Sequence, residues 1–257
     1  MDDVQIKEIV RARYGGIAAA SETSCCAPPA SSCSGPEATS DDKARRMGYS
    51  EAELAAVPAG ANLGLGCGNP QAIAAMQLGE TVVDLGSGAG FDCFLAARQV
   101  GDTGRVIGVD MTHEMLKKAR ENATSIGVVN VEFRLGELEH LPIADNTADV
   151  VISNCVINLV PNKQQVFREA FRVLKPVSDV INIAPLPAEP RADPALLCGC
   201  VAGAASAERI EAWLSEAGFV KVRVKPNFEG REMVESWAAG RGVEDYIAPA
   251  MVEAHKP

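Results

Sequence analysis

The sequence is poor in histidine and in aromatic side chains, and it has no run of basic residues. Among 257 residues there are 3 histidines, 7 phenylalanines, 3 tyrosines and 2 tryptophans, and the formal net charge is −10. Phosphate groups repel a chain of this charge, so we expect no nucleic-acid partner. Each histidine, His113, His140 and His255, falls where a surface position is expected, so none stands out as a buried general base.

Long apolar runs are also missing. No stretch approaches the roughly 20 apolar residues that span a bilayer. The opening Met1-Asp2-Asp3 is acidic, whereas a signal peptide begins with basic residues. We therefore expect a cytoplasmic protein with no membrane partner, and a monomer is the expected state.

Cysteine, in contrast, is well represented, with 8 residues. Cysteines of a cytoplasmic chain usually bind metals, act in catalysis or undergo redox cycling, because that compartment keeps disulfides reduced. Some could instead be small apolar residues of the core. Three of them, Cys25, Cys26 and Cys33, lie in the stretch 21–42, whose serine, alanine and proline content predicts a flexible arm.

The chain divides into three predicted parts. Residues 1–49 hold an amphipathic helix over Val4–Tyr14, followed by the arm. Residues 50–187 begin at Ser50, a predicted helix N-cap, and include the glycine-rich loop Asn62–Pro70, which presents Cys67 and leads into a predicted helix over 71–77. Residues 188–257 carry Cys198 and Cys200 and complete the sheet.

From Thr81 onward, predicted strands and helices alternate. This order favours an α/β, Rossmann-like fold, with a mostly parallel twisted sheet and helices on both faces. The tail adds a helix and two strands that we expect to pair antiparallel. The predicted strands are Val82–Leu85, Val106–Val109, Val131–Leu135, Asp149–Asn154, Val180–Ile183, Val220–Val224 and Ala250–Ala254, and the helices are Phe91–Val100, Met115–Ile126, Gln164–Leu174 and Glu208–Ala217.

The stretch Thr81–Gly90 joins a buried strand to a glycine-rich turn. Its residues Gly86, Ser87, Gly88 and Gly90 let the backbone approach a ligand at a helix N-terminus. The spacing differs from the G-x-G-x-x-G of dinucleotide sites. Two carboxylates narrow the ligand further. Asp84 would repel a pyrophosphate but attract a cation such as the sulfonium of S-adenosylmethionine, and Asp110 is placed to accept hydrogen bonds from ribose hydroxyls.

Further cofactor candidates follow the later strands. Met111 could pack on an adenine ring, and Gly136, Glu137 and Leu138 could contact its edge. Ordinary core packing is the more common role for Met111 or Leu138 alone, but their positions at successive strand ends indicate one site. Asn154, at the end of the strand 149–154, is another candidate.

Three cysteines are placed where they could meet. Cys155 follows a predicted parallel strand, at the edge where open α/β sheets bind ligands. Cys67 and Cys200 lie on irregular segments that could fold over that edge. Three thiolates would bind a soft, thiophilic centre. Zinc is the alternative, although the chain has no Cys-x₂-Cys pair.

These motifs resemble those of the arsenite S-adenosylmethionine methyltransferases, a class I methyltransferase family, over nearly the whole chain. One departure is that Lys175-Pro176 runs straight into Val177, where the family usually has a Gly-Gly turn; either residues are missing from the sequence, which we favour, or the chain has a deletion. The similar stretches are Val83–Asp92, Gly108–Thr112, Gly136–Pro142, Gly64–Pro70, Ile152–Leu159 and Cys200–Ala204.

The resemblance implies a function and a ligand set. Cys67, Cys155 and Cys200 would bind trivalent arsenic, supplied as arsenite or an arsenic–thiol complex. Cys25 or Cys26 would act in redox cycling or receive the substrate. The implied reaction is methyl transfer from S-adenosylmethionine to arsenite and then methylarsenite for detoxification, giving mono-, di- or trimethylated arsenicals, with glutathione or thioredoxin as reductant.

Other functions stay open at this point. A methyltransferase of another small acceptor, such as a quinone, would keep the glycine turn and Asp110 but would not need the cysteine loops. A non-enzymatic, thiol-based arsenic- or metal-binding protein would keep the cysteines but would have no use for the turn. A scaffold stabilised by zinc would contain stoichiometric metal.

Overall fold

The computed structural model describes residues 1–20, 39–66, 68–72, 74–175, 178–182, 205–226, 248 and 250–257. Several sequence predictions fall outside these ranges: those for the arm between residues 21 and 38, for Cys67, and for Cys198 and Cys200. The predicted domain boundaries at 49/50 and 187/188 stay predictions. Among the described helices, none is both long and apolar enough to cross a membrane.

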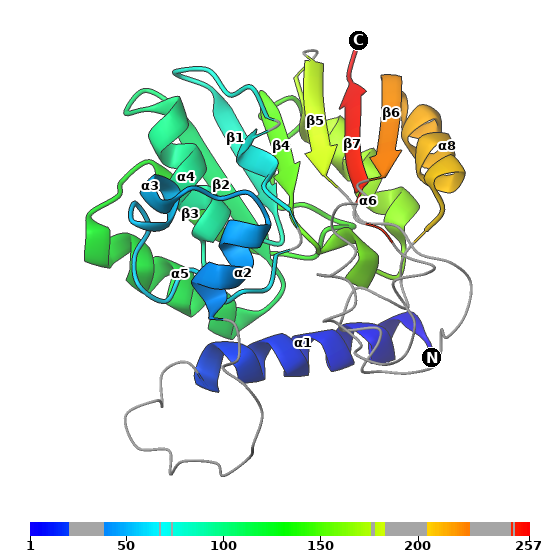
Figure 1. The fold of residues 1–257 in the computed structure, drawn as a ribbon. Helices are drawn as coiled ribbons and strands as arrows, with labels where there is room; N and C mark the ends of the chain where they lie inside the picture. The colour runs from blue at the N-terminus through cyan, green and yellow to red at the C-terminus, as the bar shows by residue number, and fades with distance from the viewer. Residues whose placement is uncertain are drawn as a thin grey trace.

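Four parallel strands form the central sheet (Figure 1). They are β1 (Thr81–Leu85), β2 (Arg105–Asp110), β3 (Val131–Leu135) and β4 (Val150–Ser153), in the order β3-β2-β1-β4. Leu85 at the end of β1 pairs with Val109 on one side and Ser153 on the other. The carboxyl ends of these neighbouring strands therefore lie at one edge, as the predicted Rossmann-like fold requires.

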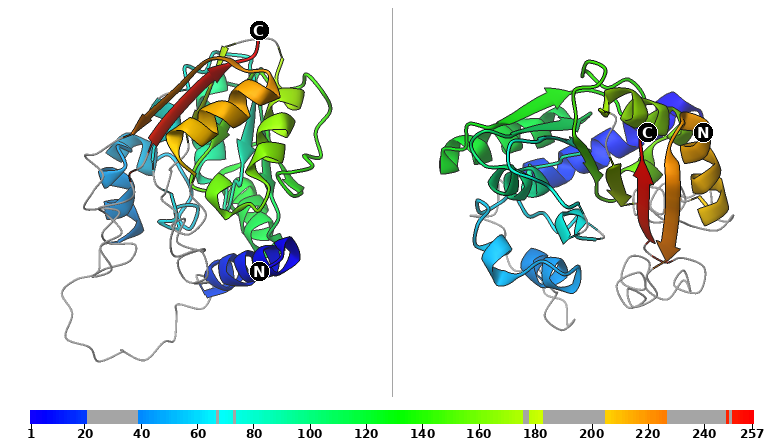
Figure 2. Two further views of the ribbon diagram at one scale, coloured as in Figure 1. Left: turned by 90° about the vertical axis from the view of Figure 1, so that its right-hand side faces the viewer. Right: turned by 90° about the horizontal axis from the view of Figure 1, so that it is seen from above.

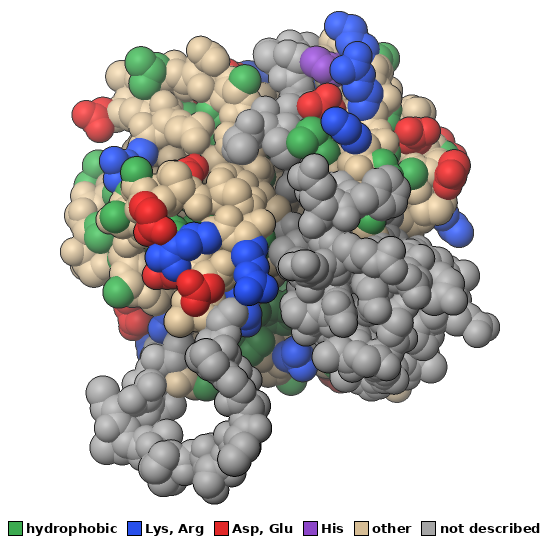
Figure 3. All heavy atoms as spheres, in the orientation of Figure 1, with side chains coloured by type: hydrophobic (Ala, Val, Ile, Leu, Met, Phe, Trp, Pro, Cys, Tyr) green, Lys and Arg blue, Asp and Glu red, His purple; other side chains and the backbone are tan. Residues whose placement is uncertain are grey.

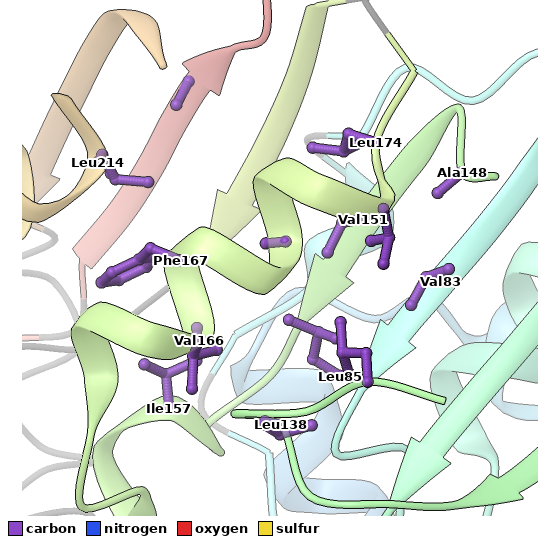
Figure 4. Packing of buried hydrophobic residues seen from close by; sticks show 14 of the residues in the cluster. Val83, Leu85, Leu138, Ala148, Val151, Ile157, Val166, Phe167, Leu174 and Leu214 are labelled. Carbon is purple, nitrogen blue, oxygen red and sulfur yellow. The ribbon is translucent and has the colours of Figure 1, made fainter. Parts of the chain in front are cut away.

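Helices cover both faces of this sheet, and each face has its own core. On one face, Val82 and Val106 pack with residues of α4 (Phe91–Val100) and α5 (His113–Ile126). On the other face, Val83 and Leu85 pack with Val166 and Phe167 of α6 (Lys163–Val173) (Figure 4). Neighbouring residues of a strand point to opposite faces, so the continuous apolar run of β1 supplies both cores.

The C-terminal strands form a second, antiparallel sheet next to β4. Its order is β5-β7-β6, with β5 (Ser178–Asn182) beside β4 and α8 (Ala207–Ala217) packed against β6 (Val220–Pro226). The predicted antiparallel pairing of the last two strands is confirmed, because β7 (Ala250–His255) pairs with β6 in that orientation. His255 is half-buried in β7, so its expected exposure is wrong.

The N-terminal elements lie near the carboxyl edge of the parallel strands. They are α1 (Asp3–Ala20), α2 (Ser40–Arg46), α3 (Glu51–Leu54) and the short 3₁₀ helix η1 (Pro70–Ala72). Figure 2 shows α1 along one end of the molecule. Figure 3 shows acidic and basic side chains interspersed over α2 and α3, where Arg45 forms ion pairs with Asp42 and Glu51.

Two predictions about these segments are wrong. Residues 40–42, placed in the flexible arm, begin α2, because Thr39 and Asp42 form a reciprocal capping box. The helix predicted over 71–77 ends after one turn. Gln71 is held instead by a long-range hydrogen bond, in which its Nε2 donates to the carbonyl oxygen of Asp92 at 3.0 Å. Ser50 is an N-cap, as predicted, and forms a capping box with Glu53.

Candidate active site

A pocket opens at the carboxyl edge of the central sheet. It encloses about 1130 Å³, including open space at its mouth. Side chains of α1 and the segment 61–66 complete its walls. Nine of the residues proposed from the sequence line it: Asp84, Gly86, Ser87, Gly88, Asp110, Met111, Leu138, Asn154 and Cys155.

Three other predicted cofactor residues do not line this pocket. Gly136 and Glu137 border an adjoining groove between α1 and α5, and Met111 borders both cavities. Glu137 forms ion pairs with Lys7 at 2.7 Å and Arg11 at 3.3 Å, which hold α1 against the end of β3. Gly90 precedes α4 with φ +92°, and a Cβ there would lie 2.8 Å from the Phe94 ring, so its lack of a side chain serves packing.

The turn after β1 shapes the floor of the pocket. Gly86 has φ +77°, and a Cβ on it would lie 2.5 Å from the side chain of Val156. Gly88 has φ +51°, but a Cβ there would meet no atom within 4 Å. The free space beside Gly88 therefore forms a cradle in which a ligand can approach the backbone closely.

Asp110 is held in place by the backbone of two segments. Its carboxylate oxygens accept hydrogen bonds from the N–H of Gly88 at 3.0 Å and of Thr112 at 2.8 Å. Burial raises the pKa of Asp110, and these hydrogen bonds oppose the rise. The carboxylate is thus oriented beside the cradle, with lone pairs that can accept ligand hydroxyls.

Asp84 is buried deeper in the same wall. Burial, and then the negative charge of Asp92, raise the pKa of Asp84 well above its usual value. The Sγ of Cys93 donates to its Oδ2 at 3.2 Å. Cys93 is a free, fully buried cysteine whose thiol pKa is raised by burial and by Asp84, so it acts as a structural donor here.

The chemistry of this lining fits S-adenosylmethionine. Two buried carboxyl groups, Asp84 and Asp92, and the half-buried Asp110 border the pocket. The nearby cation Lys7 is paired with Glu137 and Glu139. The Ser87 Oγ is buried and has no hydrogen-bond partner within the described part of the chain. A cation that carries hydroxyl and amino groups would compensate the charge and supply the missing partner.

Of the predicted arsenic ligands, the structure describes Cys155. It follows β4, is buried against Val10 and Leu159, and has φ +58°. This left-handed conformation is costly for a residue with a side chain, and such strain is commonly found at functional sites. Cys155 is disulfide-bonded in this structure, so that bond must be reduced before Cys155 can act as a thiolate ligand.

The segments next to Cys67 are described although Cys67 itself is not. Gly66 lines the pocket. The carbonyl oxygen of Gly68 accepts a hydrogen bond from Asn154 Nδ2 at 2.9 Å. Asn154 precedes Cys155, so the chain on either side of Cys67 lies close to the strand end that carries Cys155.

Sequence reasoning missed Tyr49 and Asp92. Both are buried, and the Tyr49 hydroxyl donates to Asp92 Oδ1 at 2.7 Å. The signal for Asp92 was its place in the first helical turn after the glycine-rich stretch, where an acidic residue usually serves only the helix dipole. Nothing in the local sequence around Tyr49 indicates a tertiary partner 43 positions away.

Comparison with protein families identifies the catalytic class. A methyltransferase domain family matches residues 77–218. Among solved structures, the arsenic(III) S-adenosylmethionine methyltransferase of Chlamydomonas reinhardtii is similar with a TM-score of 0.62 and 29% identity, over 84% of this chain and 73% of that one. A Haemonchus contortus phosphoethanolamine N-methyltransferase 2 in complex with S-adenosyl-L-methionine shares the fold, with a TM-score of 0.58 and 19% identity over 71% of this chain and 50% of that one.

Curated relatives narrow the family. The human arsenite methyltransferase is 38% identical over 135 residues, 47% of this chain and 36% of that protein. The arsenite methyltransferase of Halobacterium salinarum is 50% identical over 266 aligned residues, covering 100% of this chain and 68% of that protein. The chain therefore belongs to the arsenite methyltransferase family of class I methyltransferases.

Proposed function

We propose that this protein methylates trivalent arsenic, with S-adenosylmethionine as methyl donor. One observation carries the proposal beyond family membership: the cofactor cradle and Cys155 follow neighbouring, paired strands. Leu85 of β1 pairs with Ser153 of β4, and both Gly88 and Cys155 line the same pocket. A ligand in the cradle and a substrate on Cys155 would therefore lie in one cavity, which provides the proximity that group transfer needs.

The cofactor residues have distinct roles in this proposal. Asp110 would hold the ribose hydroxyls, Ser87 and the backbone around Gly88 would hold the polar end, and Asp84 would compensate the positive charge. When bound, S-adenosylmethionine supplies an electrophilic methyl group on a cationic sulfur that leaves as a neutral thioether. The buried carboxylates favour the cation over that product, because their charge is compensated only by the former.

The acceptor side needs thiolates and no base. Arsenite would exchange its oxygens for Cys67, Cys155 and Cys200, and arsenic held by three sulfurs keeps a lone pair with no proton to lose. The described histidines fit this, since none lines the pocket. Methylation oxidises arsenic formally to the pentavalent state, and two thiols that form a disulfide return the two electrons. We infer that glutathione or thioredoxin reopens that disulfide, that Cys25 or Cys26 takes part, and that the protein acts as a cytoplasmic monomer.

A second acceptor class is less well supported. A ubiquinone/menaquinone biosynthesis C-methyltransferase from Klebsiella pneumoniae is 40% identical, but over 40% of this chain. A carbon acceptor has no need of the strained Cys155. A non-enzymatic, thiol-based arsenic- or metal-binding protein would have no use for the cradle beside Gly88.

The test is methyl transfer followed by arsenic speciation. Purified protein is incubated with arsenite, S-adenosylmethionine and a reducing thiol, and the arsenicals are separated by chromatography; a quinone replaces arsenite in a parallel reaction. We expect methylated arsenic only with arsenite and cofactor together. Methylation of the quinone without methylation of arsenite would contradict the proposal.

Cofactor affinity should fall on acidification. The raised pKa values of Asp84 and Asp110 mean that a proton remains on these carboxyls up to a higher pH than usual. A bound cation favours the ionised form, so binding must release that proton, and affinity rises with pH until the free protein is already ionised. Calorimetric titration at about pH 5.5 and about pH 8 should show weaker binding and proton release at the lower pH. Equal affinity at both values, or tighter binding in acid, would contradict this.

A further inference from the structure

A hydrogen-bond network joins the buried Tyr49 and Asp92 to the half-buried Asn154, three residues that lie far apart in the sequence. The Tyr49 hydroxyl donates to Asp92 Oδ1 at 2.7 Å, and Asn154 Nδ2 donates to Asp92 Oδ2 at 3.1 Å. Asn154 Nδ2 also lies 3.3 Å from the Tyr49 oxygen. The Asp92 carboxylate thus receives neutral donors from the α2–α3 connection and from the end of β4.

The network continues into the segment that carries Cys67. Asn154 Nδ2 donates to the Gly68 carbonyl at 2.9 Å, and a Cβ on Gly66 would lie only 2.8 Å from the same nitrogen. Gly66 and Gly68 flank Cys67 in the chain, and Asn154 precedes Cys155. A single side chain therefore touches both cysteine-bearing segments.

Further bonds fix the far end of the Cys67 segment. Gln71 Nε2 donates to the Asp92 carbonyl at 3.0 Å, and Asn69 Nδ2 donates to the Gly48 carbonyl at 3.2 Å. Residues 68–71 are thereby hydrogen-bonded at more than one point to the two segments that carry Tyr49 and Asp92.

The network has little freedom to move. The Tyr49 ring is 4% exposed and packs edge-on against Phe91, with ring centroids 4.9 Å apart. Asp92 lies in the first turn of α4, where the helix N-terminus favours a negative charge. Burial raises the pKa of Asp92, and the hydrogen bonds from Tyr49 and Asn154 oppose that rise. Loss of one partner would leave buried polar groups unpaired.

We propose that Tyr49 and Asp92 are positioning residues that hold Asn154 and, through it, set the placement of the Cys67 segment relative to Cys155. This inference rests on the proposed arsenic ligands. Arsenite has three oxygens to exchange for sulfur, whereas methylarsenite has two. A displaced Cys67 segment should therefore impair capture of arsenite while sparing methylarsenite, so the network determines which arsenical is accepted.

The test compares the two substrates in the same variants. We expect Asp92→Ala to lower kcat/KM for arsenite about tenfold, the effect of losing hydrogen bonds to a buried charge, and that for methylarsenite less than about threefold. Tyr49→Phe keeps the ring packing and should shift the ratio in the same direction by a smaller factor. In the double variant the two effects should not add, because both remove the same network.

The ratio of the two substrates separates positioning from other effects. Asp92 borders the cofactor pocket, but both reactions use the same cofactor, so altered cofactor binding cancels in the ratio. Ser50→Ala is the matched control, since it removes the N-cap of α3 next to Tyr49 and should leave the ratio unchanged. If Asp92→Ala does not fold, as judged by thermal unfolding, Tyr49→Phe decides.

Two results would overturn the inference. Equal losses of kcat/KM with both arsenicals in Tyr49→Phe and Asp92→Ala would show a merely structural role, and unchanged kcat/KM with both arsenicals would show no role. If the wild-type protein is active, either of these results overturns the inference but leaves the proposed function intact. A wild-type protein that methylates neither arsenical would contradict both the inference and the proposed function.

Discussion

Replacing Cys155 with serine should abolish methylation of both arsenite and methylarsenite. A serine hydroxyl does not ionise near neutral pH and is a hard donor, so it cannot replace a thiolate on trivalent arsenic. Cys155 lies in the pocket beside the cofactor cradle, and we expect Cys200→Ser to have the same effect. Cys67→Ser should stop the first methylation and spare the later one, because methylarsenite needs fewer thiolates. Arsenic speciation after reaction with each substrate measures both outcomes.

Cys93→Ser is the matched control for the loss of a thiol. Cys93 is fully buried and donates to Asp84, and it does not line the pocket. A serine can make the same hydrogen bond, so activity should stay within about threefold of wild type, the effect of a small packing change. Full arsenite activity in Cys155→Ser or Cys200→Ser would refute the ligand assignment.

Substitutions of Asp110 and Asp84 should distinguish recognition of the ribose from compensation of the sulfonium charge. Asp110→Asn should weaken S-adenosylmethionine and S-adenosylhomocysteine alike, by about 100-fold. The amide can accept a hydrogen bond through only one of its two terminal atoms, so the N–H of Gly88 or of Thr112 loses its acceptor, and the ribose loses a carboxylate. Both ligands carry the ribose, so both are affected.

Asp84→Asn should instead discriminate between the two ligands. If Asp84 compensates the sulfonium, the variant should bind S-adenosylmethionine about tenfold more weakly and change little toward the neutral thioether product. Calorimetric titration of both variants with both ligands gives the comparison, and Asp149→Asn, a carboxylate at the opposite end of the strands that pairs with Lys175, serves as control. Equal weakening of both ligands by Asp84→Asn would exclude the assigned role.

The sequence was sufficient to predict the fold where the local residue pattern and the tertiary environment favour the same element. The strands β1, β2 and β4 are rich in β-branched apolar residues, and the helices between the strands end at capping residues such as Gly127, which has φ +68°. The predicted bounds of β3 and α4 match the observed ones, and the ends of the other elements differ by at most two residues, as expected where caps fray. Burial of Val82 on one face and Val83 on the other follows from the period of a strand.

The sequence was insufficient where a side chain bonds to a distant part of the chain. The pair Tyr49–Asp92 and the bond from Gln71 to the Asp92 carbonyl link segments with no shared local pattern. The same holds for Glu137, whose predicted contact with adenine competes with its ion pairs to Lys7 and Arg11 of α1. Such pairings depend on tertiary placement, which neither periodicity nor motif spacing encodes.

The contact between Gly86 and Val156 has a consequence for protein engineering. The glycine-rich turn after β1 and the segment after Cys155 fit together with no space for even one additional methyl group at residue 86. An attempt to graft the Cys155 segment onto another methyltransferase would carry Val156 with it and would require a glycine at the facing position of the recipient turn. The two halves of this site can therefore be exchanged between scaffolds only as a matched set.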